Sequence, residues 1–162
     1  MFQATISELQ RIAPAGSFSL LHKTVGPTQV GEFFFPPGSE FLANLAFIMK
    51  DPSFFQRPQS FNPDRFIGKD GRYKNEIASD IFQANFFRFE KSERIIPFSV
   101  GKRNCMGELL ARNEVFLFTV NLIQKIKFLP PQNNPLPNPD HFHSSVTNSA
   151  TDFYVRFSPV AK

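Results

Sequence analysis

Apolar positions at the start of the chain follow a helical period. They lie three or four residues apart, at Phe2, Ile6, Leu9 and Ile12. Pro14 ends the run because its ring cannot continue a helix. We therefore predict an amphipathic helix over residues 2–13, with Glu8 and Arg11 as neighbours on one face. Taken alone, such a pair is usually a surface ion pair.

A second helical run begins after Gly107. Its Leu, Phe, Val and Ile residues fall on most sides of a helix over residues 108–125, so we expect this helix to be substantially buried. Glu108 and Arg112 stand four positions apart in this run, in the order that favours an ion pair.

Between the two helices, shorter patterns predict strands and loops. Residues 29–35 and 39–42 flank a Pro-Pro-Gly sequence at 36–38, which predicts a hairpin or a tight strand connection with its turn at these three residues. A short apolar helix is expected over residues 42–49. Residues 52–66 contain three prolines and no clear period, which is typical of an irregular meander.

The last part of the chain combines a loop and a strand. Five prolines and several asparagines predict a loop over residues 128–139, and alternation over residues 153–157 predicts a closing strand. We expect residues 1–162 to form a single domain of mixed α and β structure, mainly helical, with short strands and an irregular meander.

Composition narrows the class of protein. The chain has 22 Phe and 14 Pro but no Trp, which favours an irregular core packed with aromatic rings. Its net charge of +4 is spread along the sequence, without the basic stripe that nucleic-acid binding requires. No apolar run approaches the roughly 18 to 20 residues of a membrane span, and a single cysteine excludes an intramolecular disulfide.

That cysteine, Cys105, lies on a loop between two glycines, Gly101 and Gly107, just before the second helix. Lys102, Arg103 and the helix start favour a thiolate, which binds transition metals. Residue chemistry alone leaves a buried, inert cysteine about as plausible as a ligating or reactive one.

Two other kinds of cysteine site have less support. A zinc site could combine Cys105 with His141 and His143, but the spacing places no fourth ligand. A nucleophilic cysteine is supported only by scattered histidines.

The loop resembles a known motif. Its residues Phe98, Gly101, Arg103, Cys105 and Gly107 fit F-x-x-G-x-R-x-C-x-G, the haem-binding signature of the cytochrome P450 family, and the following Gly-Glu-Leu-Leu-Ala-Arg run resembles animal members. The resemblance implies that Cys105 is the proximal thiolate ligand of the iron in haem b (iron protoporphyrin IX). It also implies that Arg103 and His22 neutralise the haem propionates, and that Phe98, Ser99, Gly101 and Gly107 contact the cofactor.

Further motifs of the same family lie elsewhere in the chain. Glu8 and Arg11 resemble its E-x-x-R pair, and residues 61–66, Phe-Asn-Pro-Asp-Arg-Phe, supply the third member at Arg65. By this resemblance the three side chains form a buried charge network beneath the cysteine loop. The segment before His22 then contributes substrate contacts, with candidates Ala15, Gly16, Ser17, Phe18, Ser19, Leu20 and Leu21.

One segment does not fit the family pattern. Residues 77–90 are surplus to the short turn that usually joins the arginine segment to the cysteine loop, and we interpret them as an insertion, with a retained intron as the hypothesis for their origin.

The resemblance covers the C-terminal part of the cytochrome P450 fold and implies haem-thiolate monooxygenation of a small apolar substrate. Expected partners are an NADPH-dependent reductase or cytochrome b5, docked on Lys91, Arg94 and Lys102 at the proximal face. Full-length members are bound to the endoplasmic reticulum, whereas this chain, without an anchor, is expected to be cytoplasmic or peripherally associated. The alternative is a truncated product that lacks the distal oxygen-activating helix and has no enzyme activity.

Overall fold

A computed structural model describes residues 2–73, 94–138, 142–144 and 147–160 of the protein. The helices are α1 (Phe2–Ile12), α2 (Leu45–Ile48), α3 (Glu108–Lys125) and the single-turn 3-10 helices η1 (Pro63–Phe66) and η2 (Gly101–Arg103). The strands are β1 (His22–Lys23), β2 (Thr28–Val30), β3 (Phe33–Phe35), β4 (Glu40–Phe41), β5 (Ile126–Leu129), β6 (Phe142–Ser144), β7 (Asn148–Ala150) and β8 (Arg156–Pro159).

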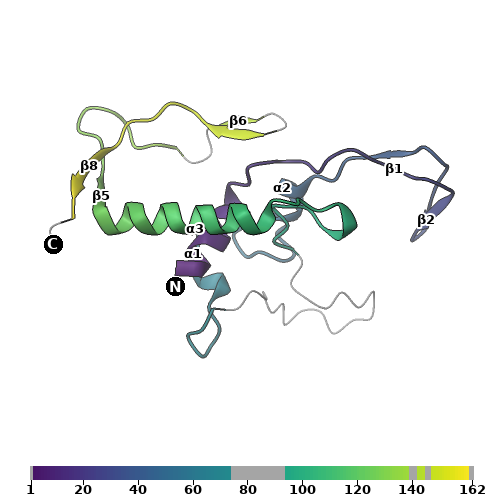
Figure 1. Ribbon diagram of the computed structural model, residues 1–162, viewed down its shortest axis with the longest axis horizontal. Helices are drawn as coiled ribbons and strands as arrows, with labels where there is room; N and C mark the ends of the chain where they lie inside the picture. The colour runs from purple at the N-terminus through teal and green to yellow at the C-terminus, as the bar shows by residue number, and fades with distance from the viewer. Residues whose placement is uncertain (1, 74–93, 139–141, 145–146, 161–162) are drawn as a thin grey trace.

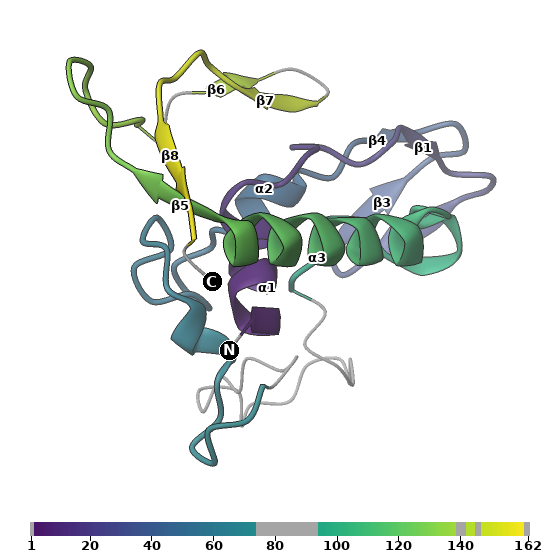
Figure 2. The same cartoon turned by 60° about the vertical axis from the view of Figure 1, so that its left-hand side comes forward.

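The long helix α3 runs across the middle of the molecule, and α1 crosses beside it (Figures 1 and 2). The edge of the Phe2 ring meets the Phe116 ring at a centroid distance of 5.5 Å, which joins the two helices. The β5–β8 pair lies at the end of α3, and η2 lies before its start (Figure 1). Thus α3 separates the cysteine loop from the C-terminal strands.

The core gathers around α1 and the meander that follows α2. α1 ends because Pro14 cannot donate a helical hydrogen bond, and the Asn62 side chain accepts from the Asp64 N–H to begin η1. α1 and the meander both turn apolar side chains toward this core. The buried apolar residues are Ala4, Ile6, Leu45, Met49, Phe55, Phe66 and Ile96. The expected amphipathic first helix and the irregular meander are therefore present.

The strands pair differently from the expected hairpin. β2 and β3 pair antiparallel, with Val30 opposite Phe33, so the chain turns at Gly31 and Glu32 rather than at residues 36–38. Gly31 has φ +58°, a left-handed conformation that glycine adopts without strain. Residues 36–38 instead connect this pair to β4, which pairs antiparallel with β1. Of the two predictions for residues 36–38, the tight strand connection is therefore confirmed and the hairpin turn is wrong, and residues 29–35 contain two strands instead of one.

Helix α3 has the predicted bounds but not the predicted burial. None of its 18 residues is buried, and Leu109, Leu110, Leu117 and Phe118 are each more than half exposed. The reason is that, within the described part of the chain, only α1 and β5 contact it substantially. An apolar sequence indicates which faces favour burial, but not whether enough neighbouring chain is present to cover them.

Two further boundaries differ from prediction. The closing strand begins at Arg156 instead of Phe153, because the pairing of β8 with β5 runs from Arg156 to Pro159. The helix expected over residues 42–49 is shorter, since the Asn44 side chain caps it by accepting from the Phe47 N–H. The proposed insertion at 77–90 lies outside the described residues. No helix that the structure describes is long and apolar enough to cross a membrane.

Candidate functional site

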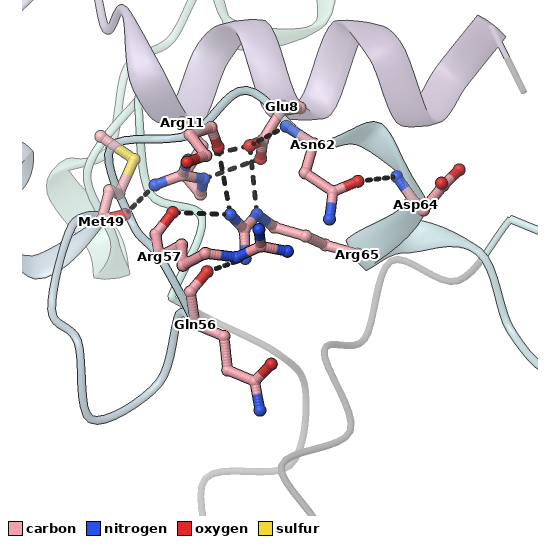
Figure 3. A network of polar contacts seen from close by, with 9 residues as sticks. Glu8, Arg11, Met49, Gln56, Arg57, Asn62, Asp64 and Arg65 are labelled. Atoms are coloured by element: carbon pink, nitrogen blue, oxygen red, sulfur yellow. Dashed lines mark hydrogen bonds and ion pairs between the residues drawn. The ribbon is translucent and has the colours of Figure 1, made fainter.

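A buried charge network joins α1 to the meander. Arg11 donates to both oxygens of Glu8, from Nε at 2.7 Å and from Nη2 at 2.9 Å, and both side chains are completely buried (Figure 3). The remaining amino group of Arg11 donates to the Met49 carbonyl at 2.9 Å, and its guanidinium lies 5.0 Å from the centre of the Phe55 ring. The pair is therefore not the exposed surface pair that spacing alone favours.

Arg65 completes this network from η1. Its Nε donates to Glu8 at 3.1 Å, and its two amino groups donate to the backbone carbonyls of Gln56, Arg57 and Ser60 (Figure 3). The Glu8 carboxylate also accepts from the Asn62 N–H at 2.8 Å. One carboxylate thus fixes two arginines and the start of η1. The structure brings together the three residues that the sequence motifs linked.

The cysteine loop has its own internal hydrogen bonds. The Cys105 N–H donates to the Phe98 carbonyl at 2.9 Å, and the Asn104 N–H donates to the Gly101 carbonyl at 3.2 Å. Gly101 has φ +81°, which a residue with a side chain rarely adopts. This geometry leaves Cys105 exposed just before α3, so its thiol is an accessible soft metal donor.

Strained backbone occurs in the meander beside the charge network and in the cysteine loop. Arg57 and Ser99 are the non-glycine residues with positive φ in the described part of the chain, at 48° and 64°. The Arg57 carbonyl accepts from Arg65, and Ser99 lies on the cysteine loop. Such conformations cost about 1–3 kcal/mol each and concentrate at functional sites.

Arg112 links the loop to α1. Its Nε donates to Glu108 at 2.9 Å, one turn earlier in α3, and its Nη1 donates to Gln10 of α1 at 3.3 Å. Its guanidinium also lies 5.1 Å from the centre of the Phe98 ring. The sequence indicated the ion pair with Glu108, but not these contacts with α1 and the loop.

Two basic residues precede the cysteine closely in the chain, and the other expected docking residues lie elsewhere. Lys102 and Arg103 lie on η2, and both are exposed. Arg94 lies over the Phe54 ring, and burial lowers the pKa of its guanidinium, although Asp51 opposes the shift. The third expected docking residue, Lys91, lies outside the described residues.

The histidine and the candidate substrate-contact segment lie on and before β1. His22 is exposed, and its Nδ1 is 2.7 Å from the Leu20 carbonyl. Phe18, Leu20 and Leu21 are exposed, whereas Ser19 is nearly buried because its hydroxyl joins the Leu20 carbonyl to the Ala43 N–H. Within residues 18–21, these three present exposed apolar side chains for contact.

The described residues do not support the two alternatives that use histidine, a zinc site at Cys105 and a nucleophilic cysteine. Among the described residues, no group of three or more His, Cys, Asp or Glu side chains is arranged to hold a metal ion. His143 lies on β6, and the adjacent candidate ligand His141 lies outside the described residues.

A residue not indicated by the sequence joins the two ends of the chain. Asn148 of β7 donates from Nδ2 to the Pro14 carbonyl and to the Ser17 hydroxyl, both at 2.9 Å. Its backbone N–H also donates to the Ala15 carbonyl at 2.7 Å. Two of these acceptors are backbone carbonyls, which leave no signal in a sequence.

Comparisons with known proteins agree with this arrangement. The family model described as cytochrome P450 matches residues 1–157. Cytochrome P450 2A13 of Homo sapiens is 37% identical over 131 residues, which cover 81% of this chain and 23% of that protein. Cytochrome P450 2J3 of Rattus norvegicus is 37% identical over 146 residues, which cover 90% of this chain and 25% of that protein. The chain thus spans about a quarter of the length of these curated relatives.

A solved structure extends the comparison to the fold. It is described as a zebra fish cytochrome P450 with abiraterone, and it matches with a TM-score of 0.77 at 26% sequence identity. The match covers 99% of this chain and 34% of that chain. The expectation of a mixed α and β portion of that fold is confirmed.

Proposed function

Because this chain belongs to the cytochrome P450 family, we propose that it binds haem b through the Cys105 thiolate and forms the thiolate side of a monooxygenase site. When bound, this group supplies the iron at which dioxygen is reduced and one oxygen atom is transferred to an apolar substrate. The observation that carries the proposal is the exposed Cys105 thiol on a hydrogen-bonded loop at the start of α3.

The residues around the thiol fit such a group. Cys105 offers an exposed sulfur, a soft donor of the kind that binds transition metals, just before α3. Arg103, two residues earlier, is exposed and suited to a charge-assisted bond with a propionate. A side chain at Gly107 would approach the Cys105 sulfur to 3.8 Å, so the glycine keeps that side of the sulfur open.

We assign separate tasks to the other loop residues. Phe98 would pack against the bound cofactor beside the sulfur, and its carbonyl holds the Cys105 backbone. Ser99, Gly101 and Gly107 let the loop pass close to a flat cofactor, and His22 donates to the second propionate. The exposure of His22 on β1 is compatible with that role.

The network of Glu8, Arg11 and Arg65 positions the loop from a distance. It holds α1 against the meander. Arg112 then connects α1 to the cysteine loop through its contacts with Gln10 and Phe98. Buried ion pairs fix geometry more dependably than they add stability, which suits a positioning role.

We propose the substrate and the partners as chemical classes. A small apolar substrate would contact the segment before His22, at Phe18, Ser19, Leu20 and Leu21. Lys91, Arg94 and Lys102 would dock an acidic electron donor, an NADPH-dependent reductase or cytochrome b5, at the thiolate face. We propose the endoplasmic reticulum membrane as the location of full-length members, with this chain cytoplasmic or peripherally attached.

We further propose that these 162 residues alone bind haem weakly and do not turn over substrate. Oxygen chemistry requires that water be excluded from the site. The residues at positions 101–106 are all exposed, and the described residues do not cover the thiol.

The test is a reduced carbon monoxide difference spectrum of the chain expressed with haem supplied. We expect a thiolate-type band, which Cys105→Ala removes and Arg103→Ala weakens. Far-UV circular dichroism of each variant checks that the protein is still folded. Equal bands from the parent chain and Cys105→Ala would contradict ligation by this sulfur.

A further inference from the structure

One side of α3 presents a row of apolar residues at a regular spacing. We call this row the α3 seam, and its members lie at intervals of four, three and four positions: Ala111, Val115, Phe118 and Leu122. Helices that pack against each other along their length show this spacing, because residues three and four apart lie on one face. The seam is open to solvent in the described part of the chain, since Val115 is 36%, Phe118 67% and Leu122 45% exposed.

The seam lies apart from the side of α3 that α1 contacts. Phe116, whose ring meets the Phe2 ring of α1, directly follows Val115 and therefore lies about 100° around the helix from it. Leu109 and Ile123 stand seven residues before and after Phe116, so they share its side of the helix. The contact with α1 thus leaves the seam uncovered.

Leu110 and Leu117 are also exposed, but they form no comparable row. Glu114 lies between them on the same face, and Asn121 follows. Burying these polar groups against a second helix without hydrogen-bond partners would cost free energy. The seam is therefore the side of α3 best suited to pack against another helix.

The seam is complementary to itself when a second copy of the helix runs in the opposite direction. Turned end for end about the midpoint of the seam, the second copy places its Leu122 opposite Ala111 and its Phe118 opposite Val115. A small side chain then faces a large one at each level, which fills the space between two helices without voids or overlap. A two-fold axis repeats each of these contacts.

The charges at the two ends of α3 favour the same arrangement. Glu108 and Lys125, the first and last residues of α3, continue the spacing of the seam, and the end-for-end turn places them opposite each other. Lys125 is exposed, and none of the ion pairs within the described part of the chain involves it. Glu108 already binds Arg112, and a carboxylate can accept from a second donor. A parallel pair of helices would instead bring like charges together at both ends, which is unfavourable.

We propose that α3 pairs with the α3 of a second copy of this chain, antiparallel and about a two-fold axis, along the α3 seam. The four seam residues of each copy are fewer than the roughly 20 to 30 residues a side of a standard interface, so the dissociation constant should be micromolar. Cys105 precedes α3 and lies outside the seam. The pairing therefore stands or falls independently of haem ligation.

Sedimentation equilibrium of the 162-residue chain without haem tests the pairing, and we expect a monomer–dimer equilibrium at micromolar concentrations. Phe118→Glu places a carboxylate in the seam twice per dimer, so the association constant should fall about a hundredfold. Phe34→Glu is the matched control, because Phe34 on β3 has the same 67% exposure, and its association constant should equal that of the parent chain. Far-UV circular dichroism shows that each variant is folded. A chain that stays monomeric, that assembles beyond a dimer, or that associates equally with Phe118→Glu overturns the proposal.

Cross-linking tests the antiparallel direction. In a chain that carries Cys105→Ser, Ala111→Cys and Leu122→Cys are made separately, and the two proteins are mixed and mildly oxidised. Positions 111 and 122 face each other across the proposed dimer, whereas the two copies of position 111 lie about 16 Å apart along the helix axis, too far for a disulfide. We expect a disulfide-linked dimer from the mixture and none from either protein alone. Cross-links in each protein alone, or none in the mixture, overturn the antiparallel pairing.

Discussion

The charge network and the cysteine loop differ in how completely the chain surrounds them. Glu8 and Arg11 are 0% exposed, and the structure leaves no buried side-chain nitrogen or oxygen without a hydrogen-bond partner among its described residues. In contrast, residues 101–106 are exposed, and α3 beside them has no buried residue. The first region is completed by contacts within the chain, whereas the second presents its functional groups outward.

This difference assigns the two regions different energetic roles. Removing one partner from a buried ion pair leaves the other charged and unsatisfied, at a cost of about 3–5 kcal/mol. Changing an exposed side chain usually alters stability by no more than about 0.5 kcal/mol. Substitutions in the network should therefore act through folding, and substitutions in the loop through ligand binding.

The largest expected effect is that of Glu8→Ala. It leaves Arg11 buried without a carboxylate and removes the one charged acceptor of Arg65 among the described residues, so we expect a loss of about 3–5 kcal/mol in the free energy of unfolding. Urea unfolding followed by circular dichroism measures this loss. Haem incorporation should disappear with the fold of α1, and a haem spectrum equal to that of the parent chain would show that the network does not support the loop.

Cys105→Ser is the matched substitution in the exposed region. The side chain is exposed and similar in size, so the free energy of unfolding measured in urea should stay within about 0.5 kcal/mol of the parent value. The thiolate-type band should nevertheless be lost. A large loss of stability in this variant would mean that the two regions are not energetically distinct.

The regular elements were the part of the fold that the sequence predicted well. α1 has a strongly periodic pattern and α3 has a long apolar one, and the bounds of α3 agree with the prediction. The β2–β3 turn was missed because Pro-Pro-Gly at 36–38 is a stronger local turn signal than Gly31 with Glu32. Which strands pair depends on distant neighbours, as the pairing of β1 with β4 shows.

In the candidate site too, the sequence predicted some contacts and missed others. Motifs predicted that Glu8, Arg11 and Arg65 meet, because each is a side chain of fixed type at a fixed spacing. The contacts of Asn148 with the Pro14 and Ala15 carbonyls had no such signal, since every residue offers a carbonyl. The exposure of α3 was also missed, because periodicity reports which residues are apolar and not what covers them.

A smaller loss of stability is expected when one arginine of the charge network, and one beside the cysteine loop, is replaced by lysine. Arg65 donates four hydrogen bonds through a planar fork, and an ammonium group cannot reproduce that geometry. We expect Arg65→Lys to cost about 1–3 kcal/mol in the free energy of unfolding, because the buried Glu8 carboxylate and three backbone carbonyls share a donor that lysine replaces only in part. Urea unfolding measures the change.

Arg112→Lys is the control for this exchange. The Arg112 side chain is 38% exposed, and its ion pair with Glu108 is of the kind worth about 0.3–0.5 kcal/mol. Lysine at the same position keeps the charge, so the loss should be smaller still. Equal losses for the two variants would remove the distinction between a buried and an exposed arginine site.

The smallest expected effect concerns Asp51, where the meander meets the segment that leads to the cysteine loop. The Ser53 hydroxyl and then the Ser53 N–H, at 2.7 and 2.8 Å, hold the pKa of the Asp51 carboxyl below its usual value, and the Arg94 charge adds to this. A carboxyl with a lower pKa in the folded state stabilises the fold above its unfolded pKa of about 3.9. That stabilisation is lost as the pH falls through the folded pKa.

Asp51→Asn removes the charge but keeps an oxygen that can accept from Ser53. The variant should therefore be slightly less stable than the parent chain at pH 7, with a difference that shrinks progressively below about pH 4. Urea unfolding of both proteins at several pH values between about 3 and 7 measures this change. Because Asp51 is partly exposed to solvent, the difference should remain well below that of Arg65→Lys. A difference that stays constant over this pH range would assign the effect to hydrogen-bond geometry, and the charge of Asp51 would then contribute nothing to the junction between the two regions.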